Sequence, residues 1–141
     1  MTEVASEQDR IGGILQSCRS IAVVGLSPRP ERDSHRVASY LQEAGYRIIP
    51  VNPRVSEVLG ERAYASLDEI PGEVDLVDVF RRPEEIPELA EAAIRKGIRA
   101  FWMQLGIRHA GAAERLRAAG IDVVEDRCTL VEHQARRQRQ S

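Results

Sequence analysis

The side chains best suited to chemistry gather in a proline-containing segment that follows an early apolar run. The segment Gly25–Ser34 carries two arginines, Arg29 and Arg32, and two hydroxyls, Ser27 and Ser34. Guanidinium groups donate charge-assisted hydrogen bonds to phosphate oxygens, and the N-terminus of a following helix also favours an anion. These residues therefore predict a phosphate-binding loop. The alternative is a stiff surface turn, in which Ser34 only caps a helix and the arginines are solvated.

The same segment departs from the glycine-rich loop that binds the pyrophosphate of dinucleotides. That loop has the pattern GxGxxG, whose later glycines let the backbone approach the ligand and the helix pack closely. Only Gly25 survives from this pattern, and Pro28 and Pro30 stand in a longer loop. The sequence therefore argues against an ordinary dinucleotide site.

Further arginines follow the next two apolar runs. Arg54 comes directly after Asn52 and Pro53, and Arg81 comes directly after Phe80. An NAD site usually offers an acidic residue after its second strand, whereas a cation there suits an extra ribose phosphate. Arginines that converge on one rim predict a polyanionic ligand. Salt bridges to the many glutamates are the alternative.

Five short apolar runs, rich in β-branched residues, predict the strands that position these loops. Continuous apolar runs of this length are typical of strands buried on both faces of a parallel sheet. The expected strands are residues 21–24, 47–51, 75–80, 100–103 and 122–124.

The segments between the runs have helical periodicity and recognisable end signals. Ser34 is a good N-cap for a helix that stops at Gly45, and Pro83 opens a helix that stops at Gly97. Helices are also expected at residues 9–18, 112–119 and 129–139, and two short turns at residues 57–60 and 66–69.

The alternation of strands and helices predicts one α/β domain over residues 1–141, with a core over about residues 20–133. Right-handed crossovers make this a doubly wound, mainly parallel five-stranded sheet with helices on both faces. Ligands of such folds bind beyond the carboxyl ends of the strands. The arginine loops should therefore meet at one edge of the sheet, together with residues 104–110, in which His109 is expected to be loop structure.

Composition and charge narrow the classes of partner. The formal net charge is -2 and the sequence pI is about 6.0, so no general attraction to nucleic acid or anionic membrane is expected. Cys18 and Cys128 stand alone, which argues against a disulfide framework or a zinc site. Met1–Val4 lacks the layout of a signal peptide, and no apolar run is long enough to span a bilayer. We expect a soluble cytoplasmic protein, either a monomer or a homodimer.

A few residues suggest catalysis without forming a convincing site. Cys128, Glu132 and His133 are close in sequence, but positions i and i+5 of a helix do not share a face. A position at a helix N-terminus would permit redox chemistry at the thiol of Cys128, although a packed cysteine is the simpler expectation. Asp75 and Asp78 are poorly oriented for an acid pair, and no cluster has metal-ligand spacing. The sequence favours a binding protein over an enzyme.

Four segments over residues 21–133 carry a resemblance to a known family. They are GLSPRPERDSHRVASYLQEAGYRIIPVNPR at 25–54, VDLVDVFRRP at 74–83, FWMQLGIRH at 101–109 and DRCTLVEH at 126–133. The chain resembles the small stand-alone CoA-binding proteins of bacteria and archaea and, more distantly, the N-terminal domain of the succinyl-CoA synthetase α subunit. The first segment, with its GYxxxPVNP ending, is the specific one. The resemblance implies a Rossmann-like fold and coenzyme A as the ligand.

The resemblance also implies which residues bind CoA. In the related synthetase domain, the first loop, a lysine after the second strand and the end of the fourth strand contact CoA, and Arg54 stands near the lysine position. Phe80 and Arg81 are expected to form a wall and a phosphate contact, and Asn52 and Pro53 to shape the adenosine side. The full expected set is Gly25, Leu26, Ser27, Pro28, Arg29, Arg32, Ser34, Val51, Asn52, Pro53, Arg54, Phe80, Arg81, Trp102, Met103 and Gln104.

The expected function is binding of CoA or acyl-CoA without catalysis, as a carrier, sensor or regulator. The synthetase's phosphohistidine domain and nucleotide-binding partner have no counterpart here, so we do not expect this chain alone to couple CoA to nucleotide hydrolysis. One alternative is an NAD(P)-linked redox sensor or enzyme. Another is an accessory subunit of an acyl-CoA-using enzyme, docking through a basic last helix with Arg136, Arg137 and Arg139.

Overall fold

The computed structural model describes residues 6–140 of the chain and the side chains of residues 6–138. The strands are β1 (Ser20–Val24), β2 (Arg47–Val51), β3 (Glu57–Val58), β4 (Glu61–Arg62), β5 (Leu76–Val79), β6 (Ala100–Met103) and β7 (Asp122–Val124). The helices are α1 (Glu7–Ser17), α2 (Asp33–Glu43), η1 (Leu67–Glu69), η2 (Pro83–Glu85), α3 (Ile86–Lys96), α4 (Ala110–Ala118) and α5 (Thr129–Gln140). The five strands and five longer helices that the sequence predicts are confirmed. None of the described helices is long and apolar enough to cross a membrane.

The five longer strands form one sheet in the order β2-β1-β5-β6-β7, and every neighbouring pair is parallel. The chain starts at β1, adds β2 on one side and then crosses to β5 on the other. Val24 of β1 stands opposite both Val51 of β2 and Val79 of β5, so these three strands end level with one another. The strand order reverses at this point, which is where ligands bind in such sheets.

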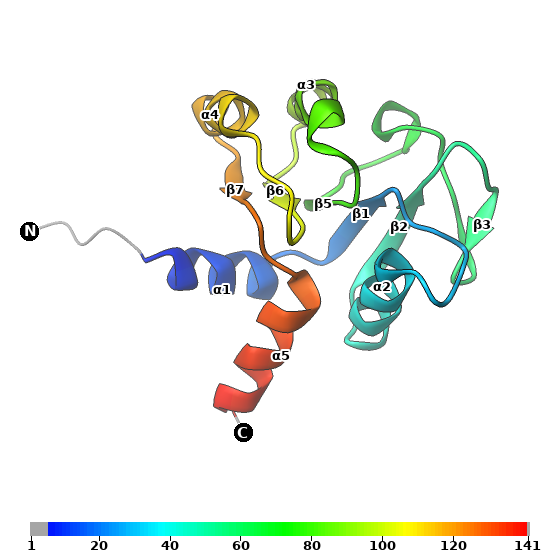
Figure 1. The fold of residues 1–141 in the computed structure, drawn as a ribbon, viewed down its shortest axis with the longest axis horizontal. Helices are drawn as coiled ribbons and strands as arrows, with labels where there is room; N and C mark the ends of the chain where they lie inside the picture. Colours follow the sequence, from blue (N-terminus) through cyan, green and yellow to red (C-terminus); the bar gives the residue numbers. More distant parts are fainter. Residues whose placement is uncertain (1–5, 141) are drawn as a thin grey trace, which may run out of the picture.

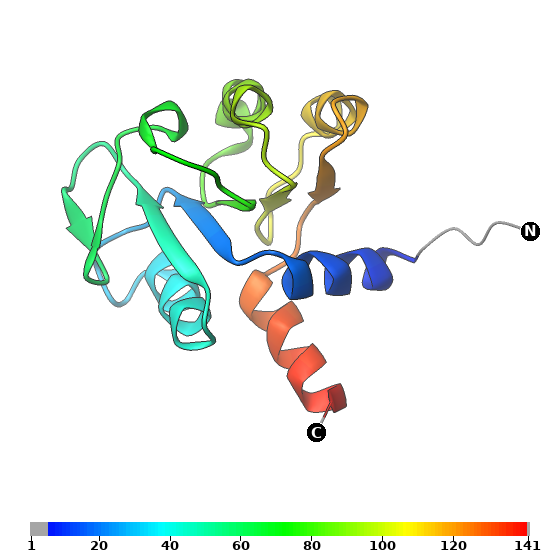
Figure 2. The same cartoon turned by 180° about the vertical axis from the view of Figure 1, so that it is seen from behind.

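Helices cover both faces of the sheet, as Figures 1 and 2 show: α3 and α4 lie on one face, and α1, α2 and α5 on the other. Successive strand residues point to opposite faces. Ala22 and Val24 of β1 therefore join the aliphatic core under α3 and α4, while Ile21 and Val23 join the core under α1 and α2. Burial on both faces explains the uninterrupted apolar runs.

The connection from β2 to β5 contains the β3–β4 hairpin and the single turn η1, in agreement with the two short turns that the sequence predicts. Tyr64, after the hairpin, forms one parallel bridge with Val51 at the end of β2. The backbone N–H of Asn52 also donates to the carbonyl of Tyr64 (2.9 Å). This connection therefore supports the loop that follows β2.

The N-termini of α2 and α4 differ from what the sequence predicts. The expectation that Ser34 caps α2 is wrong, because Arg32 holds the N-cap position and makes no side-chain cap bond. The buried Ser34 hydroxyl instead accepts a hydrogen bond from the backbone N–H of Ser27 (3.0 Å) and so closes the loop. His109 is not plain loop structure either: it is the N-cap of α4, and its Nδ1 accepts from the N–H of Ala112 (3.0 Å).

Candidate ligand-binding cleft

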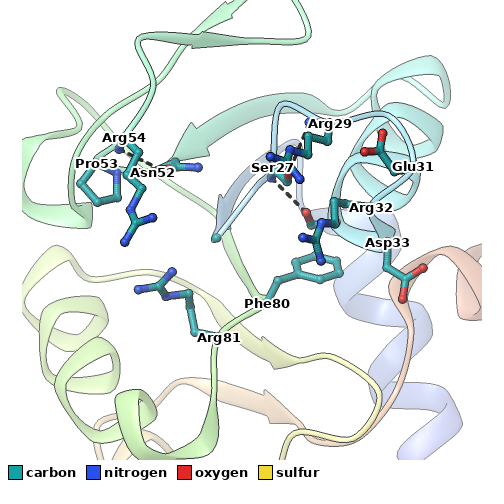
Figure 3. Close-up of a pocket in the computed structure, with 12 residues that line it drawn as sticks. Ser27, Arg29, Glu31, Arg32, Asp33, Asn52, Pro53, Arg54, Phe80 and Arg81 are labelled. Carbon is teal, nitrogen blue, oxygen red and sulfur yellow. Dashed lines mark hydrogen bonds between the residues drawn. The ribbon is translucent and has the colours of Figure 1, made fainter.

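An open cleft of about 820 Å³ lies beyond the carboxyl ends of β1, β2 and β5 (Figure 3). Three loops, one after each strand, form its walls, and its size is within the usual range for ligand sites. The lining residues are Gly25, Ser27, Arg29, Glu31, Arg32, Asp33, Ser34, Asn52, Pro53, Arg54, Phe80 and Arg81. All except Glu31 and Asp33 are among the residues that the sequence predicts. We call this site the anion cleft.

Gly25 permits the closest approach between two of the loops. Its φ is +86°, in the left-handed region that favours glycine. A Cβ at this position would lie 2.6 Å from the carbonyl oxygen of Phe80 and 2.9 Å from Cδ of Arg81. The surviving glycine is therefore needed to pack the β1 loop against the β5 loop.

Hydroxyl and amide side chains hold the loops in shape. Besides the bond between Ser27 and Ser34, the Nδ2 of Asn52 donates to the carbonyl of Leu26 (2.9 Å). The Oδ1 of Asn52 accepts from the backbone N–H of Arg54 (2.9 Å). Asn52 thus links the loop after β2 to the loop after β1. These bonds hold the loops in shape, and the arginines supply the positive charge of the cleft.

Positive charge exceeds negative charge around the anion cleft, whose lining holds four arginines and two acids. In the described part of the chain, Arg29, Arg32 and Arg54 form no ion pair, whereas Arg81 pairs with Glu85 (Nη2–Oε1, 2.7 Å). Figure 3 shows Arg54 and Arg81 pointing toward each other from opposite walls. Like charges that face each other repel, and an anion between them removes the repulsion.

The salt-bridge alternative holds for part of the rim. Arg82 also approaches Glu85 (3.8 Å), and Arg36 approaches Asp33 (3.4 Å). Surface pairs of this kind contribute only about 0–1 kcal/mol. A phosphate can therefore compete with Glu85 for Arg81.

Several predicted residues do not line the anion cleft. Trp102 and Met103 are fully buried, because strand ends in a sheet covered on both faces point into the core. Leu26, in the loop after β1, is also fully buried, in the core under α1 and α2. The indole Nε1 of Trp102 donates to the carbonyl of Arg127 (2.7 Å), so its ring is not available to stack on a ligand. Pro28 is exposed on the loop. The predicted residues outside the lining are Leu26, Pro28, Val51, Trp102, Met103 and Gln104.

A buried polar cluster, which the sequence analysis missed, ties β5 and β6 to α5. The Nε2 of Gln104 donates to Asp78 Oδ1 (2.6 Å) and to Thr129 Oγ1 (2.8 Å), and Thr129 Oγ1 donates to Asp78 Oδ2 (2.9 Å). Burial raises the pKa of Asp78 to about 7, although both hydrogen bonds act to lower it. We call these three residues the Asp78 cluster. The only signal in the sequence was one carboxylate inside an otherwise apolar strand.

Cys128 does not join a catalytic pair with the residues near it in sequence. The Nδ1 of His133 is hydrogen-bonded to the hydroxyl of Tyr40 (2.8 Å), and Glu132 pairs with Arg127 (3.4 Å). Cys128 and His133 therefore face different surroundings, as the helix spacing predicts. Cys128 instead lines a second cleft, at the carboxyl ends of β5 and β6.

Comparison with known proteins assigns the family. Residues 19–134 match the family model of the CoA binding domain. The chain belongs to this family. It is 48% identical over 120 residues to the uncharacterized protein YneT of Bacillus subtilis, a match that covers 85% of this chain and 89% of YneT. It is also similar to the solved structure of a hypothetical protein from Pyrococcus horikoshii, with a TM-score of 0.88, 38% identity and coverage of 96% and 98% of the two chains.

Part of the chain is also similar to a larger enzyme. It is 38% identical over 82 residues to the α subunit of the ADP-forming acetate–CoA ligase II of Pyrococcus furiosus. The match covers 57% of this chain but only 18% of the ligase subunit. The resemblance to stand-alone CoA-binding proteins is thus confirmed, and the family implies CoA as the ligand.

Proposed function

We propose that the protein binds coenzyme A in the anion cleft and catalyses no reaction by itself. The observation that carries this proposal is the convergence of Arg29, Arg32, Arg54 and Arg81 on one cleft, in a member of the CoA-binding domain family. CoA carries a pyrophosphate and a ribose phosphate. Several guanidinium groups around one cleft match that charge.

The loops suggest how the phosphates are held. Arg29 and Arg32 stand just before the N-terminus of α2, where unpaired backbone N–H groups and the helix dipole favour an anion. Arg54 follows β2, where an extra ribose phosphate is accommodated in related folds. We infer that the first pair serves the pyrophosphate and that Arg54 serves the ribose phosphate.

The composition of the anion cleft supports binding without catalysis. Its lining holds no histidine, cysteine or lysine among the described residues, and of its two acids Asp33 is paired with Arg36. A general base or nucleophile with a positioned partner is therefore lacking at the cleft. The role that follows is that of a carrier, sensor or regulator.

Thermal unfolding with ligand tests the proposal. A ligand that binds only the folded state raises the melting temperature, and a hundredfold excess over Kd should give a rise of roughly 5–10 °C. CoA should give the largest shift and dephospho-CoA a smaller one, since it lacks the ribose phosphate. No shift with millimolar CoA overturns the proposal, and a larger shift with NADP than with CoA favours the redox alternative.

Helix α5 gives little support to the alternative that the protein is an accessory subunit of an acyl-CoA-using enzyme. The guanidinium of Arg136 is partly buried and donates to the carbonyl of Gln8, so it is not free for docking. Arg137 is exposed, and the side chain of Arg139 lies outside the described residues. Copurification with an acyl-CoA-using enzyme would favour this alternative.

A further inference from the structure

A second cleft, of about 420 Å³, adjoins the anion cleft at the carboxyl ends of β5 and β6. The two clefts share Asp33, Phe80 and Arg81, so they are continuous around the β5 loop. The lining residues of the second cleft are Asp33, Arg36, Val37, Phe80, Arg81, Arg82, Pro83, Gln104, Leu105, Ile107 and Cys128. We call it the apolar cleft.

The chemistry of the apolar cleft differs from that of its neighbour. Leu105, Ile107 and Cys128 form part of its wall. Its charged lining residues are Asp33, Arg36, Arg81 and Arg82, of which Asp33 and Arg81 also line the anion cleft. Leu105 is 71% exposed. When an apolar ligand group covers a large aliphatic side chain that otherwise faces water at the mouth of a cleft, the free energy of the complex falls.

One buried polar side chain contributes an unused acceptor to this cleft. Gln104 is only 4% exposed, and its Nε2 donates to the carboxylate of Asp78 and to the hydroxyl of Thr129. In the structure the amide is oriented with Nε2 toward both partners, while the Thr129 hydroxyl donates to Asp78. The Oε1 of Gln104 accepts no hydrogen bond from the described residues. Since Gln104 lines the cleft, this oxygen is the atom of the side chain that is left to accept a hydrogen bond from a ligand.

We propose that the apolar cleft holds the thiol end of the pantetheine arm and a short aliphatic acyl chain, so that the preferred ligand is a short-chain acyl-CoA. This inference rests on the proposed binding of CoA in the anion cleft. The arm passes Phe80 from one cleft to the other, and an amide N–H of the arm donates to Oε1 of Gln104. The acyl chain then lies against Leu105, Ile107 and Cys128.

Continuity and charge select this occupant over a separate partner. A ligand that is polyanionic at one end and apolar at the other matches a cationic cleft that leads into an apolar one. The volume of about 420 Å³ is at the low end of ligand sites, which limits the chain to a few carbons beyond the arm.

Isothermal titration with CoA, acetyl-CoA, butyryl-CoA and hexanoyl-CoA tests the inference. Each methylene that enters the cleft should tighten binding by up to about fourfold, the equivalent of about 0.8 kcal/mol. Affinity should therefore rise from acetyl-CoA to butyryl-CoA and level off once the chain outgrows the cleft. If CoA binds and butyryl-CoA binds no more tightly, this inference fails while the proposed function stands. If neither CoA nor any thioester binds, both fail.

Two matched variants localise the effect. Leu105→Ser removes the apolar group at the mouth of the cleft, and the ratio of butyryl-CoA to CoA affinity should fall at least severalfold. Val131→Ser is the control, because Val131 is also a large exposed aliphatic residue (56% exposed) but lies on α5 and does not line the cleft. Its ratio should equal that of the unaltered protein. An unchanged ratio in Leu105→Ser, or an equal fall in Val131→Ser, overturns the placement of the acyl chain.

Discussion

The anion cleft and the Asp78 cluster lie at the same edge of the sheet and share β5, yet charged groups are exposed to solvent in the cleft and buried in the cluster. Arg54 stands exposed without an ion pair, so its charge costs little in the unliganded protein and is available to a ligand. Asp78 is fully buried, and its charge is opposed by desolvation even with two hydrogen bonds. Changes in the cleft should therefore alter binding, whereas changes in the cluster should alter stability.

The most severe test of this division is Gly25→Ala, since Gly25 belongs to the cleft but should behave like a core residue. The methyl group would lie 2.6 Å from the carbonyl of Phe80, in addition to the strain of its positive φ. We expect a loss of about 3 kcal/mol in the free energy of unfolding, measured by urea denaturation. Gly97→Ala is the control: it has a φ of +73° with nothing within 4 Å, and should lose only about 1 kcal/mol. Equal losses would show that the close approach at Gly25 is unimportant.

The Asp78 cluster should reveal itself through the pH dependence of stability. The folded-state pKa of Asp78, about 7, lies above its ordinary value of 3.8, so the folded protein retains a proton that the unfolded chain releases. The stability contributed by this group is present below pH 3.8 and is lost as the pH rises toward 7, by up to about 1.4 kcal/mol per pH unit.

Asp78→Asn removes this titration. The free energy of unfolding of the unaltered protein relative to Asp78→Asn, measured at several pH values, should fall between pH 4 and 7 and then level off. A difference that stays constant with pH would contradict the raised pKa.

Arg54→Ala should weaken CoA binding by roughly tenfold, because it removes a charge-assisted hydrogen bond to phosphate, while the free energy of unfolding changes by less than about 0.5 kcal/mol. Arg47→Ala is the matched control, as Arg47 is exposed at the start of β2, at the opposite end of the strand from the cleft. Titration calorimetry measures both. Similar losses in the two variants would mean that the cleft acts only through the net charge of the protein.

The smallest effect is expected at Glu85, which holds Arg81 in the unliganded cleft (2.7 Å). Glu85→Gln releases the guanidinium for phosphate, so CoA affinity should rise about two- to threefold, and stability should change by no more than about 0.5 kcal/mol. Weaker binding in this variant would show that Glu85 orients Arg81 for the ligand rather than competing with it.

Local patterns were sufficient to predict most of the fold. The five apolar runs became the five strands, because strands buried on both faces must be apolar throughout. Gly97 ends its helix as expected, whereas Pro83 opens the short turn η2 and α3 itself begins at Ile86. Ser34 and His109 were misread because a side chain near a helix start can bond either to the helix or to a neighbouring loop.

Part of the candidate site could likewise be predicted from local patterns, and part could not. Arginines that follow three parallel strands must lie at the same edge of the sheet, and the structure brings Arg29, Arg32, Arg54 and Arg81 together there. Side chains at the strand ends were harder to place. The one-residue alternation between the two faces of a strand, and the helices that cover each face, decide whether such a residue faces the core or a ligand. Trp102 and Met103 are fully buried for this reason.

The sequence by itself determined the alternation of strands and helices that makes an α/β sheet, the charge of the loops at its carboxyl edge and the absence of a complete GxGxxG pattern. These properties belong to residue types and short spacings. Only the tertiary structure decided that Gly25 must lack a side chain, that Asp78 is buried beside Gln104 and Thr129, and that an apolar cleft adjoins the anion cleft. Each of these depends on contacts between groups that are far apart in the chain, such as Asp78 and Gln104 (26 positions apart) or Asp78 and Thr129 (51 positions apart), which no local pattern encodes.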